Sequence, residues 1–311
     1  MSVAWTSSYP DYTFDGDNKN IPIVFSAKTL KRFYEATVLN EISNTEYIGE
    51  IKAKGDKVII RTVPDITIND YLKGSDLELE NPESPSIELT IDYSKYFNFA
   101  LDDVDTQQMD INMISKWAEN AASRMKIVIE TAVYADIYAD SDTYNAGNTA
   151  GYISQNLLLG ATGAPVAVTP DNILDKIIDC GQCLDERNQN EQGRWMILPA
   201  WAIAMIKKSE LKDVSITGDS QSILRNGRVG MIDTFTLYKS NILSTATDSS
   251  GPVCTRILYG TKDALAFAMS INKTENYRPQ NTFANAMKGL VVYGYKVVID
   301  DAFGMLYAYK G

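Results

Sequence analysis

Two cysteines three positions apart are the residues whose types and spacing come closest to a chemical motif. Cys180-Gly-Gln-Cys183 matches the C-x-x-C pattern of thiol–disulfide enzymes. In those enzymes the first cysteine follows a strand and opens a helix, because the helix dipole lowers the pKa of its thiol. Here the pair lies about ten residues inside an amphipathic helix that we expect to begin at Thr169, so a redox protein is the less favoured interpretation. A zinc site is not expected either, since only Cys254 remains as a further thiol ligand.

The sequence contains no His, which removes the usual general base near neutral pH and the commonest metal ligand. Ser-His-Asp and Cys-His catalysis are therefore excluded. Asp102, Asp103 and Asp105 could pair for glycoside hydrolysis or bind Mg²⁺. Three acids at the start of a predicted helix are more typical of positions that the helix dipole favours, and no glycine-rich phosphate motif occurs. We predict no catalytic residue, no cofactor and no metal site, so the protein is not expected to be an enzyme.

Composition predicts one or two domains with a sizeable core. The chain has 311 residues, of which 45% are hydrophobic, and a net charge of -11. So acidic a chain is a poor candidate for binding a phosphate backbone, which rests on a local excess of Lys and Arg. Three cysteines give no disulfide framework. The first residues do not resemble a secretory signal, and no run of about 18 apolar residues could span a bilayer. We expect a soluble cytoplasmic protein with no membrane partner.

The N-terminal part is predicted to be an arm followed by a short helix. Residues 1–25 are broken by proline and glycine, yet they contain the aromatic residues Trp5, Tyr9 and Phe14. Aromatic side chains in a loose terminus need a surface to cover, either on their own subunit or on another one. Residues 26–49 carry an apolar stripe at helical spacing.

A long β-hairpin is predicted over residues 50–104. In its return strand, Ile87 to Leu101 alternate between apolar and polar over about 15 residues. The connecting segment 70–86 is polar and acidic, whereas residues 50–61 are mainly basic. A two-stranded ribbon is marginal alone in water, and its free edge invites pairing with another chain. The hairpin is therefore predicted to lie on a second copy of the protein.

A long helix and an α+β region complete the chain. Apolar residues recur at helical spacing from about residue 105 to 139, which predicts a helix roughly 50 Å long. That length matches the width of a compact chain of this size, so we expect an elongated body. After a loop-like segment at 141–168, helices are predicted from Thr169-Pro170-Asp171 and over 199–210, with strands at 195–198, 231–238, 256–259, 290–299 and 305–309.

The serial order of these parts resembles the major capsid proteins of tailed bacteriophages, of the Hong Kong 97 type. Local phrases resemble them too, among them GDKVIIRTVPDITINDY at 55–71, SIELTIDYSKYFNFALDDVD at 86–105, RWMILPAWAIAMI and the terminal GLVVYGYKVVIDD. The resemblance implies an α+β fold with six segments. They are an N-terminal arm (1–25), a short helix region (26–49), an extended E-loop hairpin (50–104), a spine helix with the peripheral domain (105–164), an axial domain (165–285) and strands that return to the peripheral domain (286–311).

The resemblance also implies a function and partners. The chain would assemble into pentamers and hexamers of an icosahedral head around double-stranded DNA, without sequence-specific binding. It would be found in the virion after assembly in the host cytoplasm. Because the arm is too short to hold a scaffolding segment, we expect a separate scaffolding protein, with a portal and in some cases a decoration protein. An encapsulin-type compartment shell, which shares the fold, is the alternative. Predicted inter-subunit contacts are Trp5, Tyr9, Phe14, Tyr71, Leu72, Lys73 and Asp76.

Overall fold

The computed structural model describes residues 37–45, 57–61, 66–71, 73, 74, 76, 79–82, 86–103, 113–209 and 230–311. The predicted arm, with Trp5, Tyr9 and Phe14, lies outside these ranges, and so does Leu72. The helices are α1 (Leu39–Ile42), α3 (Met113–Tyr134), α4 (Ile173–Glu186) and α5 (Ala200–Ile206), with 3₁₀ turns η2 (Ile137–Asp140), η3 (Thr143–Asn145), η5 (Lys262–Ala264) and η6 (Asp300–Ala302). The strands are β1 (Lys57–Arg61), β2 (Ser86–Thr90), β3 (Tyr93–Asp102), β4 (Val166–Val168), β5 (Arg194–Leu198), β6 (Met231–Ile232), β7 (Phe235–Lys239), β8 (Thr245–Thr247), β9 (Val253–Thr261), β10 (Leu265–Tyr277), β11 (Ala284–Val297) and β12 (Phe303–Lys310).

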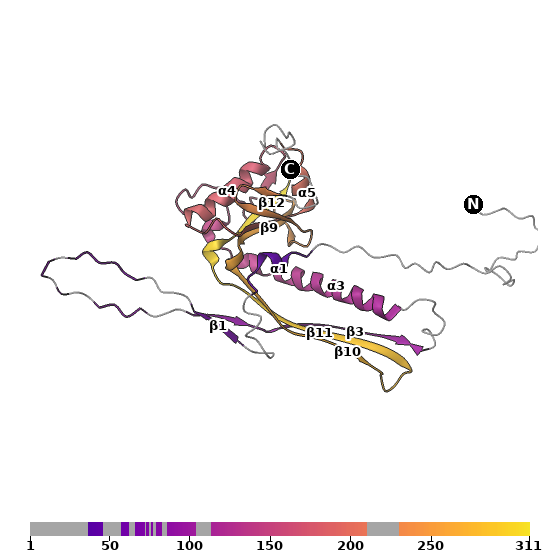
Figure 1. Cartoon of the computed structure of the whole chain (residues 1–311). Coiled ribbons are helices and arrows are strands. Elements are labelled where there is room, and N and C mark those ends of the chain that lie inside the picture. Colours follow the sequence, from indigo (N-terminus) through magenta and orange to yellow (C-terminus); the bar gives the residue numbers. More distant parts are fainter. Residues whose placement is uncertain are drawn as a thin grey trace, which may run out of the picture.

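A seven-stranded mixed sheet with α4 and α5 forms what we call the compact unit, at the top of Figure 1. Its strand order is β4-β12-β9-β5-β7-β6, with β8 paired to β9. The central strand β5 is buried along its whole length, as its apolar sequence predicts for a strand covered on both faces. Met196 and Leu198 face α4 and α5, whereas Trp195 and Ile197 face the core that contains the end of α3.

A three-stranded antiparallel sheet, β10-β11-β3, with α3 lying along it forms the elongated unit. In Figure 1 the sheet and the helix extend together away from the compact unit. The helix packs through the apolar face that its sequence predicts, with Met125, Ile129 and Val133 buried. Farther out, the ring of Trp117 meets Phe99 of β3 edge to face, with 5.9 Å between centroids.

The predicted hairpin is present as β1 and β2, which pair antiparallel from Lys57↔Thr90 to Arg61↔Ser86. Its base is held by a small core in which Val58, Leu89 and Ile91 pack on Ala266, Ala268 and Val292. From that base the described part of the hairpin projects to the left of Figure 1, on the opposite side from the free end of the three-stranded sheet.

The return strand predicted over residues 87–101 is two strands with different partners. Its first part, β2, pairs with β1, whereas β3 pairs with β11. The change falls after Ile91, which is fully buried in the small core at the hairpin base. The predicted alternation holds for Leu89, Ile91 and Leu101, which are buried, but not for Tyr93, which is 44% exposed just after the change of partner.

Other predicted elements differ in extent. The described helix α3 ends at Tyr134 and not near residue 139, because the chain tightens into η2 where Asp136 accepts a hydrogen bond from the hydroxyl of Tyr295 at 2.9 Å. The helix predicted from Thr169 begins at Ile173, since residues before it form a turn in which the backbone N–H of Thr169 donates to Asn172. Within α4, the apolar residue Ile178 is exposed.

The C-terminal strands are longer and more numerous than predicted. Strand β10 was not expected, although its alternating Leu265, Phe267 and Met269 carry the period of a strand. The boundary at residues 285 and 286 lies inside β11, and residues 286–311 contribute to both sheets through β11 and β12.

Candidate functional site

The cysteine pair lies where thiol chemistry is disfavoured. Cys180 and Cys183 are free, fully buried, and on the face of α4 that packs against the seven-stranded sheet. Burial raises the pKa of the Cys180 thiol well above its ordinary value and that of Cys183 to about 12. A redox cysteine needs the opposite shift together with access to a partner thiol.

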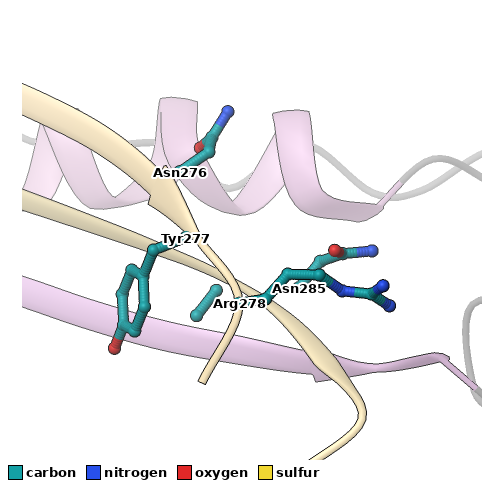
Figure 2. Close-up of a pocket in the computed structure, with 5 residues that line it drawn as sticks. Asn276, Tyr277, Arg278 and Asn285 are labelled. Carbon is teal, nitrogen blue, oxygen red and sulfur yellow. The ribbon is translucent and has the colours of Figure 1, made fainter. Parts of the chain in front are cut away.

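The acidic cluster has structural contacts. Asp102 ends β3, Asp103 pairs with Arg278 and accepts a hydrogen bond from Asn285 at 3.3 Å, and Asp105 lies outside the described residues. Next to this pair, at the tip of the β10–β11 hairpin, is a pocket of about 360 Å³ (Figure 2). Asn276, Tyr277, Arg278, Asn285 and Ala286 line it. They include no nucleophile paired with a base, so they do not form a catalytic arrangement.

Metal ligation and membrane insertion find no support in the described ranges. No group of three or more Cys, Asp or Glu residues among them is arranged to hold a metal ion. None of the helices in the described part of the chain has the length and apolar character needed to cross a bilayer.

Glu130 is a buried carboxylate whose contacts join two elements. Glu130 of α3 accepts hydrogen bonds from the backbone N–H of Val38 at 2.9 Å and from the hydroxyl of Tyr134 at 2.6 Å. Burial raises its pKa, and both hydrogen bonds oppose that shift. The group borders a pocket of about 120 Å³ between α1, α3 and β10. Its contacts attach the start of the described chain to the long helix.

The projecting hairpin carries the most exposed apolar side chains among the described residues. Ile68 is 91% exposed and Leu79 is 89% exposed, and Ile66 and Tyr71 are also well exposed. The two limbs of the loop are joined by Glu80, which accepts hydrogen bonds from the backbone N–H of Thr67 at 2.9 Å and from its hydroxyl at 3.3 Å. Exposed apolar side chains gathered on one loop are typical of surfaces that bind another molecule.

The sequence-predicted contacts fall on this hairpin where they are described. Tyr71, Lys73 and Asp76 are exposed and lie close together along the loop. The prediction missed Ile66 and Ile68, which are more informative because they are apolar. In the sequence, Ile66 and Ile68 lie on either side of Thr67, and this short apolar–polar alternation could have located them.

A second group of exposed side chains lies on the three-stranded sheet. Tyr96 of β3 and Leu290 of β11 are paired neighbours on its open face, and Tyr96 is 79% exposed. Near them, Lys288 forms an ion pair with Glu275 at 3.0 Å. Phe283, in the turn beyond β10, is also exposed. The molecule thus presents apolar surface on two structures that extend in opposite directions (Figure 1).

Comparison with models of protein families gives no match, and a search of the curated proteins gives none. The structure, however, is similar to solved phage structures over almost its whole length. A chain of Mycobacterium phage Che8 is 22% identical, with a TM-score of 0.73 over 94% of this chain and 98% of that chain. A chain in the capsid of cyanophage P-SCSP1u is 16% identical, with a TM-score of 0.72 over 99% and 100%. A chain in the mature capsid of bacteriophage PhiM1 is 14% identical, with a TM-score of 0.67 over 98% of each.

These similarities establish the class of fold. The chain has the α+β fold of phage capsid proteins, and the predicted Hong Kong 97-type fold is confirmed.

Proposed function

We propose that this chain is the major capsid protein of a tailed bacteriophage, a structural subunit without enzymatic activity. One observation carries the proposal: the fold matches chains from phage capsid structures from end to end, with 94% to 100% of both chains covered. The buried, high-pKa cysteines argue in the same direction, against the redox alternative.

In this proposal the subunits assemble head to tail. The projecting hairpin and the outer end of the three-stranded sheet extend in opposite directions, so the hairpin of one copy can lie on the sheet of the next. Such heterologous contacts close into rings when the rotation between copies allows it. Pentamers and hexamers of this kind would build the icosahedral head.

The six segments keep the roles that the resemblance implies. Residues 50–104 would be the E-loop and reach over a neighbouring subunit, with Tyr71, Leu72, Lys73 and Asp76 in the contact. Residues 1–25 would be the arm, with Trp5, Tyr9 and Phe14 covering a neighbour. Residues 105–164 would form the spine helix and peripheral domain, residues 165–285 the axial domain, and residues 286–311 the return strands.

The expected partners of this protein are those of a shell that contains DNA. The net charge of -11 suits a shell whose lining does not grip its cargo, so double-stranded DNA would be enclosed without sequence-specific contacts. We expect a separate scaffolding protein and a portal, with a decoration protein in some heads. The protein would be assembled in the host cytoplasm and remain in the virion.

Sedimentation velocity of the purified full chain, with electron microscopy of any fast fraction, tests the proposal. We expect closed shells of uniform diameter, formed by the chain alone or with its scaffolding partner. Shells filled with one cellular enzyme would instead identify an encapsulin-type compartment. A stable monomer or dimer that stays small in the presence of the scaffolding partner would refute the capsid assignment.

A further inference from the structure

The compact unit and the elongated unit share an apolar core. Trp195, Ile197 and Phe303 of the seven-stranded sheet pack in one cluster with Val133 of α3 and Tyr293 of β11. Apolar contact of this kind resists separation of the two units, but it is not directional. Packing in this core restricts the angle at which one unit meets the other, and directional polar contacts restrict it further.

Three described segments carry the chain between the units: the stretch through η2 and η3, the turn η5, and the turn η6. Two of them pass from the shared core to the core beneath α4. The first runs from Ile137 in the shared core to Ala150 in the other core, and the second runs from Val297 of β11, through η6, to Leu306 of β12. Any rotation of one unit against the other must move these two segments.

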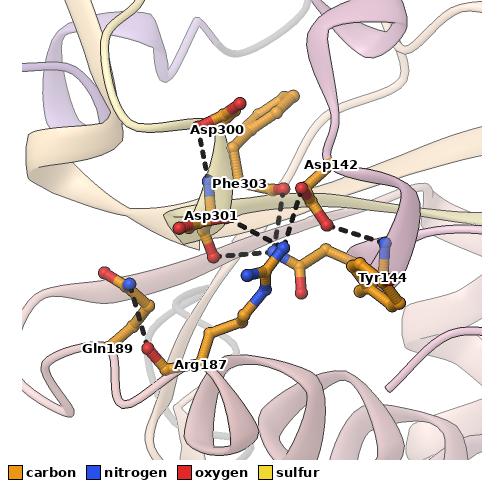
Figure 3. A network of polar contacts seen from close by, with 8 residues as sticks. Asp142, Tyr144, Arg187, Gln189, Asp300, Asp301 and Phe303 are labelled. Atoms are coloured by element: carbon orange, nitrogen blue, oxygen red, sulfur yellow. Dashed lines mark hydrogen bonds and ion pairs between the residues drawn. The ribbon is translucent and has the colours of Figure 1, made fainter. Parts of the chain in front are cut away.

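A single side chain from α4 holds both segments. Arg187, the C-cap residue of α4, places its Nη2 atom 2.9 Å from the carboxylate of Asp142 and 3.0 Å from that of Asp301. Asp142 precedes η3, and Asp301 lies in η6. Figure 3 shows the guanidinium pointing from α4 into the space between the two carboxylates.

Aromatic rings fix the same side chain from its faces. The guanidinium carbon lies 5.0 Å from the ring centroid of Tyr144 and 4.5 Å from that of Tyr152. The side chain is only 17% exposed, so solvent screens these contacts less than those of an ordinary surface ion pair. Asp142 is itself oriented, because it accepts a hydrogen bond from the backbone N–H of Tyr144 at 2.7 Å.

The two held segments are also joined to each other. The side-chain amide of Asn145, at the end of η3, donates to the backbone carbonyls of Asp301 at 2.7 Å and Phe303 at 3.3 Å. The hydroxyl of Tyr259 in β9 donates to the backbone carbonyl of Asn145 at 2.8 Å. Arg187 therefore closes a network that already connects the two segments to the seven-stranded sheet.

We infer that Arg187, Asp142 and Asp301 form an orientation clamp that sets the angle between the compact and elongated units. The shared core holds the units together, and the clamp supplies the directional contacts that the core lacks. If the subunits form a shell, as the proposed function states, the angle between the compact and elongated units would contribute to the curvature between neighbouring subunits.

The test measures the angle in the isolated subunit, so it is independent of whether shells form. Spin labels are attached to one exposed position of each unit through the substitutions Asp175→Cys in α4 and Thr274→Cys in β10. The distance between the two labels is measured by pulsed electron paramagnetic resonance. The three native cysteines are buried and do not compete for the label. With Arg187 intact we expect one narrow distance distribution, and with Arg187→Met a broader or displaced one.

Lys176→Met is the matched control, because it removes an ion pair of 2.7 Å that lies within α4 and joins no second unit. Its distance distribution should equal that of the parent. Asp301→Asn keeps the size of the side chain and removes one of the two ion pairs of Arg187, so it should broaden the distance distribution. This second variant keeps the test valid if Arg187→Met fails to fold. A folded Arg187→Met or Asp301→Asn protein with the parent's distribution would overturn the inference.

Discussion

At the scale of single residues, the cysteines give the sharpest prediction against thiol chemistry. Burial raises the pKa of Cys183 to about 12 and that of Cys180 well above its usual value. An aromatic disulfide reagent at pH 8 should therefore react with these thiols at least roughly 10³-fold more slowly than with an exposed cysteine, whose pKa is about 8.5. All three thiols should react at once in denaturant. Fast labelling of one thiol in the folded protein would restore the redox alternative.

Glu130 predicts a dependence of stability on pH. Burial raises its pKa in the folded state, so the folded protein binds more protons than the unfolded chain just above the ordinary carboxyl pKa. The contribution of Glu130 to stability should then fall as pH rises from about 4 through the raised value. Glu130→Gln should remove this slope, whereas Glu119→Gln, an exposed position on the same helix, should keep it. Denaturant titrations from about pH 4 to 7 check this, and parallel curves for parent and Glu130→Gln would contradict it.

At the scale of elements, the base of the hairpin packs closely against a glycine of β11. A Cβ atom on Gly294 of β11 would lie 2.2 Å from the backbone carbonyl oxygen of Thr90 and 3.1 Å from the Cα of Ile91. Backbone atoms cannot turn away, so Gly294→Ala should cost about 1–3 kcal/mol of unfolding free energy and loosen β2. Hydrogen exchange over residues 86–91 and denaturant unfolding measure both effects.

The comparison variant for that prediction is on the same strand. The three atoms nearest to a Cβ on Gly289 all belong to the half-buried side-chain ring of Phe97 and not to the backbone. Gly289→Ala should therefore cost less and leave exchange over residues 86–91 unchanged. Equal effects of the two substitutions would show that the close contact with Thr90 is not what holds the hairpin.

Sequence periodicity predicted the helices and strands whose apolar residues recur at a regular spacing. It did not predict which strands pair when the partners are distant in sequence. The buried face of α3 and the alternation of residues 87–101 follow from local spacing, and both are confirmed except at Tyr93, which is exposed. The change of partner after Ile91 depends on Ala266 and Val292, which are distant in sequence, and no local pattern encodes it. The same holds for the clamp, because Arg187 and Asp301 carry no motif.

At the scale of the whole molecule, the sequence predicted the surface that projects but not all of the apolar residues that are exposed on it. The hairpin region was predicted from its alternating strand and acidic loop, and Tyr71, Lys73 and Asp76 are exposed there. The most exposed apolar side chains, Ile68 and Leu79, were missed although each belongs to a short alternation of apolar and polar residues, Ile66-Thr67-Ile68 and Leu77-Glu78-Leu79. Their exposure is a property of the overall shape, since the loop extends beyond the reach of the subunit's own core (Figure 1).

The whole-molecule prediction separates stability from assembly. Ile68→Ser with Leu79→Ser removes apolar surface that the subunit itself does not bury, so its unfolding free energy should change by less than about 0.5 kcal/mol. Shell formation should be lost, and deletion of residues 70–84 should likewise give a folded subunit that does not assemble. Ile178→Ser, at an exposed apolar residue of α4, is the matched control and should still assemble. Sedimentation velocity and electron microscopy report the outcome, and normal shells from the hairpin variants would mean that subunits are joined through other surfaces.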